Sequence, residues 1–212
     1  MPSNASLPIA RPSKIVCVGR NYAEHAKEMG NAVPQEPLIF FKPPSSLIAG
    51  GESIVLPSMS TQVEYEGEIG VILGKRLRDA SEADAAAAVS GVLAVNDVTA
   101  RDLQRSDSQW TRAKGFDTFC PVGPVAAPPA DLSALSVVTR VNGQERQRAS
   151  ASDMVFTIPV LLAYISRVMT LEPGDLVLTG TPSGVGTLAP GDEVEVEVPG
   201  FSRIRNPVNK DR

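Results

Sequence analysis

The chain has 212 residues, 42% of them hydrophobic, and a formal net charge of −4 with acidic and basic residues interspersed. A chain of this length buries about 70% of the surface that its unfolded form exposes, so a sizeable core is expected. The sequence has no basic stripe for nucleic acid, no amphipathic membrane segment and no apolar run of membrane-spanning length. These observations argue against nucleic-acid binding and against membrane association.

The N-terminal segment, MPSNASLPIARPSK, has proline and polar residues where a signal peptide needs an apolar core, so we expect a cytoplasmic protein. Cys17 and Cys120 are far apart, flanked by apolar residues and outside any CxxC motif, which predicts reduced thiols in the core. The chain has no internal repeat and no linker. We therefore expect an N-terminal lead over residues 1–13 and a single domain over residues 14–212.

The first predicted elements are a short buried strand over residues 14–19 and a helix over residues 20–30, capped by Asn21 and ended by Gly30. The helix contains the only histidine, His25, with Glu28 three residues later on the same face. A carboxylate in this position orients an imidazole for general-base work, but an exposed histidine beside an incidental glutamate has the same pattern. Because glycines flank this short helix, it is also a candidate lid.

The apolar strand LIFFK, over residues 38–42, ends in a lysine, and a strand over residues 52–57 follows a loop rich in proline and glycine. A lysine at the end of a strand is usually solvated, and in some sites it binds a substrate carboxylate. Both interpretations of Lys42 stay open at this point.

The stretch VEYEGEIG, over residues 63–70, has a glutamate at every second position: Glu64, Glu66 and Glu68. A single strand would place all three carboxylates on one face, where they repel each other unless a cation lies between them. A hard divalent metal ion is one explanation. A charged, solvent-facing edge strand is the other.

A helix is predicted from Ser81, with a capping-box-like pair between Ser81 and Asp84, and residues 92–104 change from a strand to a helix near Asp97. Asp97 is a candidate ligand at the end of an apolar strand, or a plain helix cap. In the following segment Lys114 lies among aromatic residues and glycines. This setting favours a partly buried lysine with a specific role, although a packed loop also fits.

The C-terminal third predicts a hairpin over residues 135–149 that turns at Asn142 and Gly143, and an amphipathic helix over residues 157–171. A strand over residues 176–180 leads into the glycine-rich turn TPSGVG, whose backbone N–H groups and Thr181 hydroxyl are suited to an anion. An alternating strand, DEVEVEVPG, and a last edge strand, RIRNPV, complete the chain. The pattern indicates one β-rich α+β domain with a few helices.

Five blocks in this order resemble the fumarylacetoacetate hydrolase superfamily, and most closely its short single-domain branch of acylpyruvases and oxaloacetate decarboxylases. The blocks are KIVCVGRNYAEHAKEMG, PLIFFKP, EYEGEIGVILGK, NDVTARDLQ with WTRAKGFDTFCPVGP, and LVLTGTPSGVG. They span nearly the whole chain. The resemblance implies a mixed β-sheet rolled into a sandwich with a few peripheral helices, Mg²⁺ or Mn²⁺ as cofactor, and a homodimer.

The resemblance also implies functions for individual residues, each carried over by position in a matched block. Glu64 falls outside the metal motif. The implied metal ligands are Glu66, Glu68 and Asp97; the implied catalytic residues are His25, Glu28, Lys114 and Gln104; and the implied substrate-binding residues are Thr181, Arg20, Lys42 and Arg101.

The function implied is hydrolysis of an acylpyruvate such as acetylpyruvate or fumarylpyruvate to pyruvate and a carboxylic acid. Three carboxylates suit a hard cation that a 2-oxo acid can chelate, and such a cation acts as a Lewis acid on the 2-oxo oxygen. Oxaloacetate decarboxylation is the alternative, as is isomerisation or decarboxylation of a diacid from aromatic catabolism. If the protein were a non-catalytic member with this fold, we would expect residues of the acidic motif or of the His25/Glu28 pair to be replaced, and both motifs are intact. A phosphate site on TPSGVG lacks the lysine of a P-loop.

Overall fold

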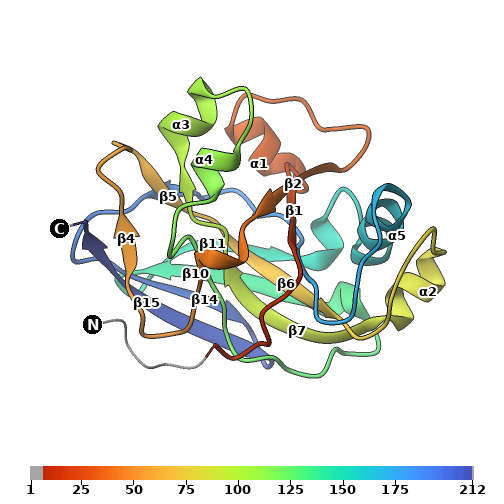
Figure 1. Ribbon diagram of the computed structural model, residues 1–212. Helices are drawn as coiled ribbons and strands as arrows, with labels where there is room; N and C mark the ends of the chain where they lie inside the picture. The colour runs from red at the N-terminus through yellow and green to blue at the C-terminus, as the bar shows by residue number, and fades with distance from the viewer. Residues whose placement is uncertain (1–6, 212) are drawn as a thin grey trace.

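The computed structural model describes residues 7–211 as two β-sheets with helices on one side and at one end (Figure 1). The first sheet has the strand order β2-β1-β12-β6-β7. Its strands are runs of valine, isoleucine and leucine, and only the pair β1–β12 is parallel. Their bounds are β1 (Ile15–Gly19), β2 (Leu38–Lys42), β6 (Gly67–Leu73), β7 (Val89–Asn96) and β12 (Leu176–Leu178).

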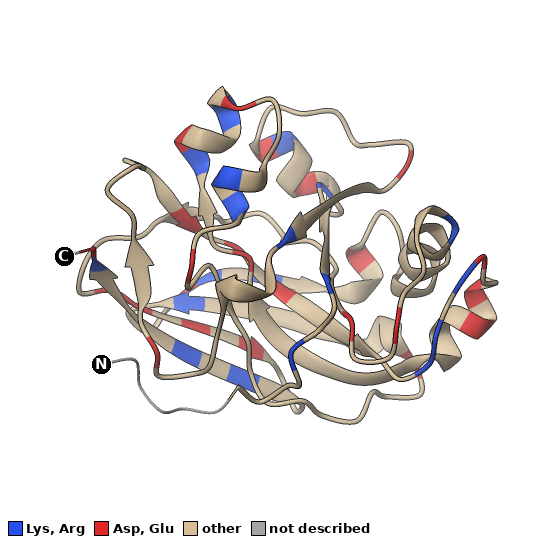
Figure 2. Ribbon diagram, viewed as in Figure 1, with Lys and Arg blue, Asp and Glu red and all other residues tan. Residues whose placement is uncertain are grey.

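The second sheet has the order β11-β10-β14-β15-β4. In β14 the valines are buried, whereas Glu195 and Glu197 accept hydrogen bonds from Arg140 on the neighbouring strand. Figure 2 shows basic and acidic positions side by side along these strands. The bounds are β4 (Ile54–Leu56), β10 (Ser136–Val141), β11 (Gln144–Ser150), β14 (Glu193–Val198) and β15 (Ser202–Lys210).

The two sheets pack against each other over a shared core. Ile69 and Val71 of the first sheet belong to the same buried cluster as Val196 and Ile204 of the second. A smaller cluster contains Cys17 and Cys120, which are both fully buried and free. The prediction of reduced core thiols is therefore confirmed, as is the predicted β-rich α+β sandwich.

Short elements complete the fold. Two small sheets have the strand orders β13-β5-β8 and β3-β9. Figure 1 shows α1, α3 and α4 together on one side, whereas α2 packs against α5 at one end. The bounds are α1 (Ala23–Glu28), α2 (Glu82–Ala87), α3 (Arg101–Ser106), α4 (Thr111–Lys114), α5 (Ile158–Val168), η1 (Pro44–Ser46), η2 (Leu132–Ala134), η3 (Ala151–Asp153), β3 (Leu47–Ile48), β5 (Val63–Tyr65), β8 (Thr99–Ala100), β9 (Cys120–Pro121) and β13 (Gly186–Thr187). Within residues 7–211, no helix has both the length and the apolar character needed to cross a bilayer.

Several local predictions are confirmed. The hairpin β10–β11 turns at Asn142 and Gly143, which have φ values of 53° and 77°, as the Asn-Gly pair requires. The hydroxyl of Ser81 caps α2 by accepting from the backbone N–H of Asp84, and its own O–H donates to the Asp84 carboxylate. Helix α5 begins after Thr157, but it ends at Val168 rather than at residue 171.

Other local predictions are wrong. Asn21 does not cap α1; its side chain is buried and bonds to backbone groups of Phe156 and Thr179, which ties the start of the helix to the core. The segment RIRNPV is not an edge strand, because β4 pairs in parallel with the end of β15 through Val208 and Ile54. The stretch VEYEGEIG is not one strand: β5 and β6 belong to different sheets, and Glu66 lies between them.

Candidate metal centre and active site

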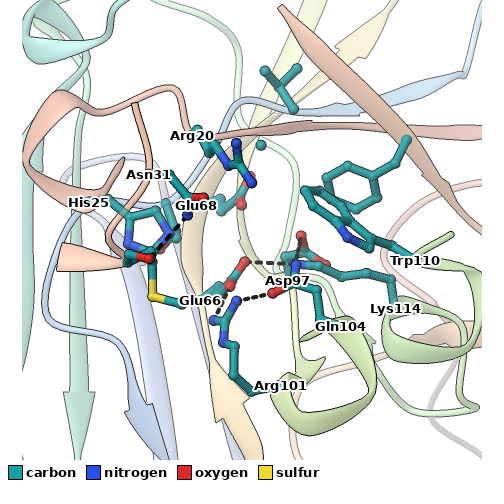
Figure 3. Close-up of a pocket in the computed structure, with 15 residues that line it drawn as sticks. Arg20, His25, Asn31, Glu66, Glu68, Asp97, Arg101, Gln104, Trp110 and Lys114 are labelled. Atoms are coloured by element: carbon teal, nitrogen blue, oxygen red, sulfur yellow. Dashed lines mark hydrogen bonds and ion pairs between the residues drawn. The ribbon is translucent and has the colours of Figure 1, made fainter. Parts of the chain in front are cut away.

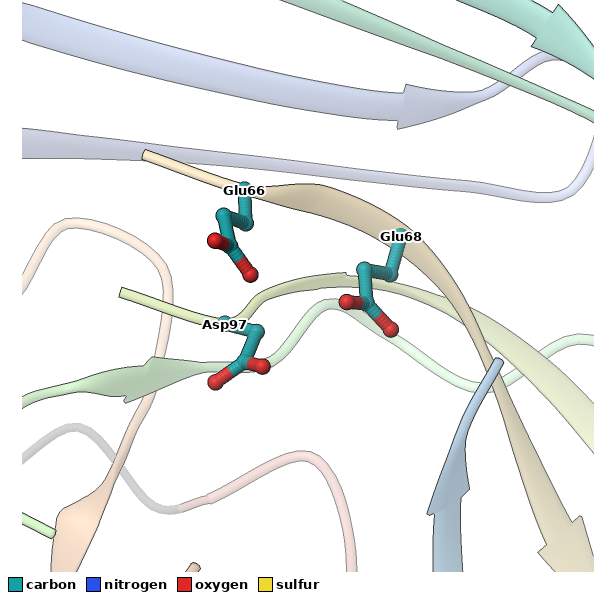
Figure 4. Close-up of side chains that lie close together, drawn as sticks. All are labelled: Glu66, Glu68 and Asp97. Carbon is teal, nitrogen blue, oxygen red and sulfur yellow. The ribbon is translucent and has the colours of Figure 1, made fainter. Parts of the chain in front are cut away.

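Three buried carboxylates meet where β6 begins and β7 ends. Glu66 lies at the break between β5 and β6, Glu68 is the second residue of β6, and Asp97 directly follows β7. The antiparallel pairing of β6 and β7 brings them together, with the backbone N–H of Asp97 donating to Glu66 O at 2.8 Å. One carboxylate oxygen from each residue lies within 4.8 Å of the others (Figure 4).

Two buried lysines form ion pairs with this acidic cluster. Lys114 Nζ lies 2.8 Å from Glu66 Oε2 and 2.6 Å from Asp97 Oδ2, and its side chain is 2% exposed. Burial lowers the pKa of Lys114, but Asp97 and Glu66 outweigh burial and raise it above its ordinary value. Lys114 is therefore a fixed cation here, not a packed-loop residue. Lys42 Nζ lies 2.8 Å from Asp97 Oδ1 and donates to Val98 O.

Glu68 is the carboxylate that the protein leaves without a cation. Among residues 7–211, no lysine, arginine or histidine lies within ion-pair distance of Glu68, and its Oε2 accepts from the backbone N–H of Gly180 at 2.7 Å. Burial, together with Asp97 and Glu66, raises the pKa of Glu68 well above its ordinary value. In contrast, burial raises the pKa of Glu66, but the positive charges of Lys114 and Arg101 lower it by more. The pKa of Glu66 therefore falls below its ordinary value.

The donor set fits a hard divalent cation. All three residues offer carboxylate oxygens, which Mg²⁺ and Mn²⁺ prefer. Among residues 7–211, Glu68 has no ion-pair partner, and Asp97 Oδ1 has an ion pair with Lys42 but no hydrogen bond. A bound cation would pair with the first and satisfy the second. The alternative of a solvated acidic edge strand is wrong, as is a helix cap at Asp97, since Ala100 is the N-cap residue of α3.

Arg101 is buried beside the acidic cluster and forms an ion pair with one of its members. Its Nε donates to Glu64 Oε2 at 2.7 Å, its Nη2 pairs with Glu66 Oε1, and its Nη1 donates to Gln104 Oε1 at 2.5 Å. Glu64 therefore turns toward Arg101 and stays outside the triad. Glu64 and Glu66 both pair with Arg101, and Glu66 also belongs to the triad with Glu68, although the acidic stretch is divided between β5 and β6.

His25 and Glu28 form a contact on α1 beside the triad. His25 Nδ1 lies 3.2 Å from Glu28 Oε2, and the histidine is 5% exposed, so it is not a surface residue. The backbone N–H of Gly184 donates to both Glu28 oxygens, at 3.0 and 3.2 Å. Glu28 thereby orients the imidazole and also ties α1 to the TPSGVG turn. A proton on Nδ1 leaves Nε2 as the basic nitrogen.

The TPSGVG turn follows β12 and passes next to the triad. Gly180 has a φ of 103°, which glycine adopts readily, and this conformation aims its N–H at Glu68. The Thr181 hydroxyl donates to Gly67 O at 3.0 Å and accepts from Gln147 Nε2 at 2.8 Å. The turn is thus bonded directly to the backbone between two of the three triad residues.

A pocket opens at the triad, and the three carboxylates form part of its wall (Figure 3). The structure brings most of the predicted site residues to its wall. Lys42 and Glu28 do not line it but contact residues that do, Lys42 through Asp97 and the more exposed Glu28 through His25. The remaining wall residues were not predicted from the sequence, because they come from segments that are far apart in the chain. Of the predicted residues, Arg20, His25, Glu66, Glu68, Asp97, Arg101, Gln104, Lys114 and Thr181 line it; the lining residues not predicted include Met29, Asn31, Phe40 and Trp110.

Two features of this wall bear on ligand binding. Phe40 and Trp110 contact edge to face, with ring centroids 5.1 Å apart, and form an apolar side. Arg20 has a φ of 59°, an uncommon conformation for a side chain of its size. Within the described part of the chain, no carboxylate forms an ion pair with Arg20, so its guanidinium is available to a ligand.

Comparison with known proteins decides the family. The model of the fumarylacetoacetate hydrolase C-terminal domain matches residues 14–209, which contain every residue of the site. The chain belongs to the fumarylacetoacetate hydrolase family. Within the family, it is 43% identical over 204 residues to the mitochondrial oxaloacetate tautomerase FAHD1 of Arabidopsis thaliana, which covers 93% of this chain and 92% of that protein.

Solved structures of fumarylacetoacetate hydrolase relatives have the same fold. The 5-carboxymethyl-2-hydroxymuconate delta-isomerase of Mycobacterium smegmatis superimposes with a TM-score of 0.88 at 45% identity, over 95% of this chain and 80% of that one. The fumarylpyruvate hydrolase of Pseudomonas aeruginosa, solved in complex with Mn²⁺ and pyruvate, superimposes with a TM-score of 0.88 at 30% identity. The match covers 99% of this chain and 93% of that one. The family therefore includes hydrolases, isomerases and tautomerases on this fold.

Proposed function

We propose that this member of the fumarylacetoacetate hydrolase family is a divalent-metal-dependent acylpyruvate hydrolase, which cleaves a 2,4-dioxo acid to pyruvate and a carboxylic acid. The observation that carries the proposal is that the His25–Glu28 pair and the acidic triad meet at one pocket. The first supplies a general base and the second a site for a hard cation. The relative solved with Mn²⁺ and pyruvate supports both the cofactor class and the product.

In this proposal Glu66, Glu68 and Asp97 hold Mg²⁺ or Mn²⁺, and the bound cation supplies Lewis-acid polarisation of the substrate's 2-oxo oxygen. His25 Nε2 takes a proton from a water molecule, and the resulting hydroxide attacks the distal carbonyl carbon. The bond between that carbon and carbon 3 breaks, so the acyl group leaves as the carboxylic acid and pyruvate leaves as its enolate. The proton that His25 took from water is then passed to carbon 3 of the enolate, which restores the neutral imidazole.

The other residues position and stabilise charge. Glu28 accepts from His25 Nδ1 and stabilises the imidazolium that forms when Nε2 takes the proton. Lys114, which stays an ammonium group, faces the negative charge that develops on the substrate. Gln104 and Thr181 line the pocket where polar substrate atoms bind.

Oxaloacetate is the second candidate substrate, because the chain is more similar to the oxaloacetate tautomerase than to the fumarylpyruvate hydrolase. Its decarboxylation breaks the bond to CO₂ and leaves the same pyruvate enolate, whereas its tautomerisation passes through the enolate of oxaloacetate itself. Neither reaction needs an attacking water. An isomerase or decarboxylase acting on a larger diacid is the remaining alternative, supported by the similarity to the M. smegmatis isomerase. A homodimer and a cytoplasmic location stay predictions.

A panel assay tests the proposed function. Protein stripped with EDTA is expected to be inactive, and Mn²⁺ or Mg²⁺ is expected to restore turnover of acetylpyruvate or fumarylpyruvate, measured as pyruvate release. Oxaloacetate tautomerisation and decarboxylation are followed in parallel, so the ratios of kcat/KM rank the candidates. Metal binding without pyruvate release from either acylpyruvate would overturn the hydrolase proposal and redirect the search to larger diacids.

Arg20 leads to a prediction about substrate charge. We expect Arg20→Asn to raise KM about tenfold for the dianions fumarylpyruvate and oxaloacetate, because a charged hydrogen bond to the distal carboxylate is lost. Asparagine tolerates the positive φ of this position, so the backbone is preserved. Acetylpyruvate has no distal carboxylate, and its KM should change little. Equal effects on all three substrates would contradict this assignment, and Arg20→Lys should recover part of the loss.

A further inference from the structure

The backbone between the two glutamates of the metal motif is held by a residue from the second sheet. Gln147 lies on β11, where its neighbours Arg146 and Arg148 are exposed, yet its own side chain is 2% exposed and points inward. Its Oε1 accepts from the backbone N–H of Gly67 at 3.0 Å. Its Nε2 donates to Thr181 Oγ1 at 2.8 Å and to Pro182 O at 2.9 Å.

These bonds close a ring. Gly67 N–H donates to Gln147, Gln147 donates to Thr181, and the Thr181 hydroxyl donates back to Gly67 O at 3.0 Å. The ring joins the residue between Glu66 and Glu68 to the turn whose Thr181 lines the pocket. Because the Gln147 amide donates to Thr181 Oγ1, the Thr181 hydrogen is directed at Gly67.

A second residue of this sheet, Thr139, lies close to Gly67. Thr139 is the partner of Gln147 across β10 and β11. A Cβ on Gly67 would lie only 1.8 Å from Thr139 Oγ1, so no larger residue fits between the glutamates without movement. The break between β5 and β6 leaves Gly67 near the end of regular pairing, and the Gln147 amide bonds to its N–H there.

We propose that Gln147 is a positioning residue that couples the metal carboxylates to the substrate-binding turn. It does not line the pocket and so acts through Gly67 and Thr181. The inference rests on the proposed function for its substrate readout only. Groups that support metal ligands from behind typically change metal affinity or activity 10- to 100-fold when they are lost.

The test compares three variants of the full chain. Gln147→Leu, which has a similar volume and no hydrogen bonds, is expected to weaken Mn²⁺ binding about 10-fold or more and to raise KM. Gln147→Glu keeps an acceptor for Gly67 N–H but, when ionised, has no donor for Thr181 or Pro182. It should bind Mn²⁺ close to wild type and still raise KM. Gln144→Leu, on the exposed part of the same strand, is the control and should change neither.

Mn²⁺ affinity is measured by calorimetry on metal-free protein without substrate, so an error in the substrate assignment leaves this part of the test intact. A purely structural function predicts a lower melting temperature for Gln147→Leu with wild-type Mn²⁺ affinity and KM, and that result would overturn the proposal. If Gln147→Leu does not fold, Gln147→Glu decides: a wild-type KM in that variant contradicts coupling to the turn.

Discussion

Glu68→Gln is expected to remove metal binding without destabilising the metal-free protein. The variant loses an ionised ligand, so we expect Mn²⁺ affinity to fall more than about 100-fold, beyond what the loss of a supporting group costs. Turnover should fall in parallel. In the metal-free protein Glu68 is a buried carboxylate with no cationic partner, and a neutral amide removes its desolvation cost while it can still accept from Gly180 N–H. Its melting temperature should therefore equal or exceed that of wild type.

Glu66→Gln is the matched comparison, because it changes the same atoms in a ligand that has cationic partners. It breaks the ion pairs with Lys114 and Arg101, and we expect it to destabilise the metal-free protein by about 3–5 kcal/mol. Calorimetry gives the Mn²⁺ affinities, and thermal unfolding with and without Mn²⁺ gives the stabilities. Wild-type Mn²⁺ affinity in Glu68→Gln would refute the metal site. A loss of stability in Glu68→Gln as large as that in Glu66→Gln would show that Glu68 does have a compensating cation.

His25→Ala is expected to lower acylpyruvate hydrolysis by about 10²-fold or more, the usual effect of losing a general base. Oxaloacetate decarboxylation should be affected less, because it needs no activated water. The comparison uses kcat for both substrates at saturating Mn²⁺, so that a change in metal affinity does not enter the result. Glu28→Gln should give a smaller loss of hydrolysis, since the amide oxygen can still accept from Nδ1–H but no longer stabilises the imidazolium.

Lys27→Gln is the control for these variants, because Lys27 lies on the exposed face of the same helix. It should retain wild-type kcat for both substrates. If His25→Ala lowers hydrolysis and decarboxylation by the same factor, the proposal that His25 serves as the base for hydrolysis only is wrong. Wild-type hydrolysis in His25→Ala would remove His25 from the mechanism altogether.

Much of the site was predictable because its residues lie in short blocks that carry their own chemistry. The patterns each fitted both a functional and a structural interpretation: the alternation of Glu66 and Glu68, the i, i+3 spacing of His25 and Glu28, and Asp97 after an apolar strand. The resemblance to the family then grouped them. What these blocks could not show is which charges compensate which, because that depends on contacts between segments far apart in the chain.

Local composition and spacing were sufficient to predict the β-rich α+β class, the buried cysteines, the Asn-Gly hairpin and the set of candidate carboxylates. The three-dimensional fold was needed to show that the acidic stretch is divided between two sheets at Glu66, and that Glu64 pairs with Arg101 whereas Glu68 has no ion-pair partner among residues 7–211. It also revealed Gln147, a glutamine in the polar strand QERQRAS whose inward direction no pattern marked. The reason is physical: which charges pair, and which way a polar side chain points, depends on the burial and partners that packing between distant strands creates.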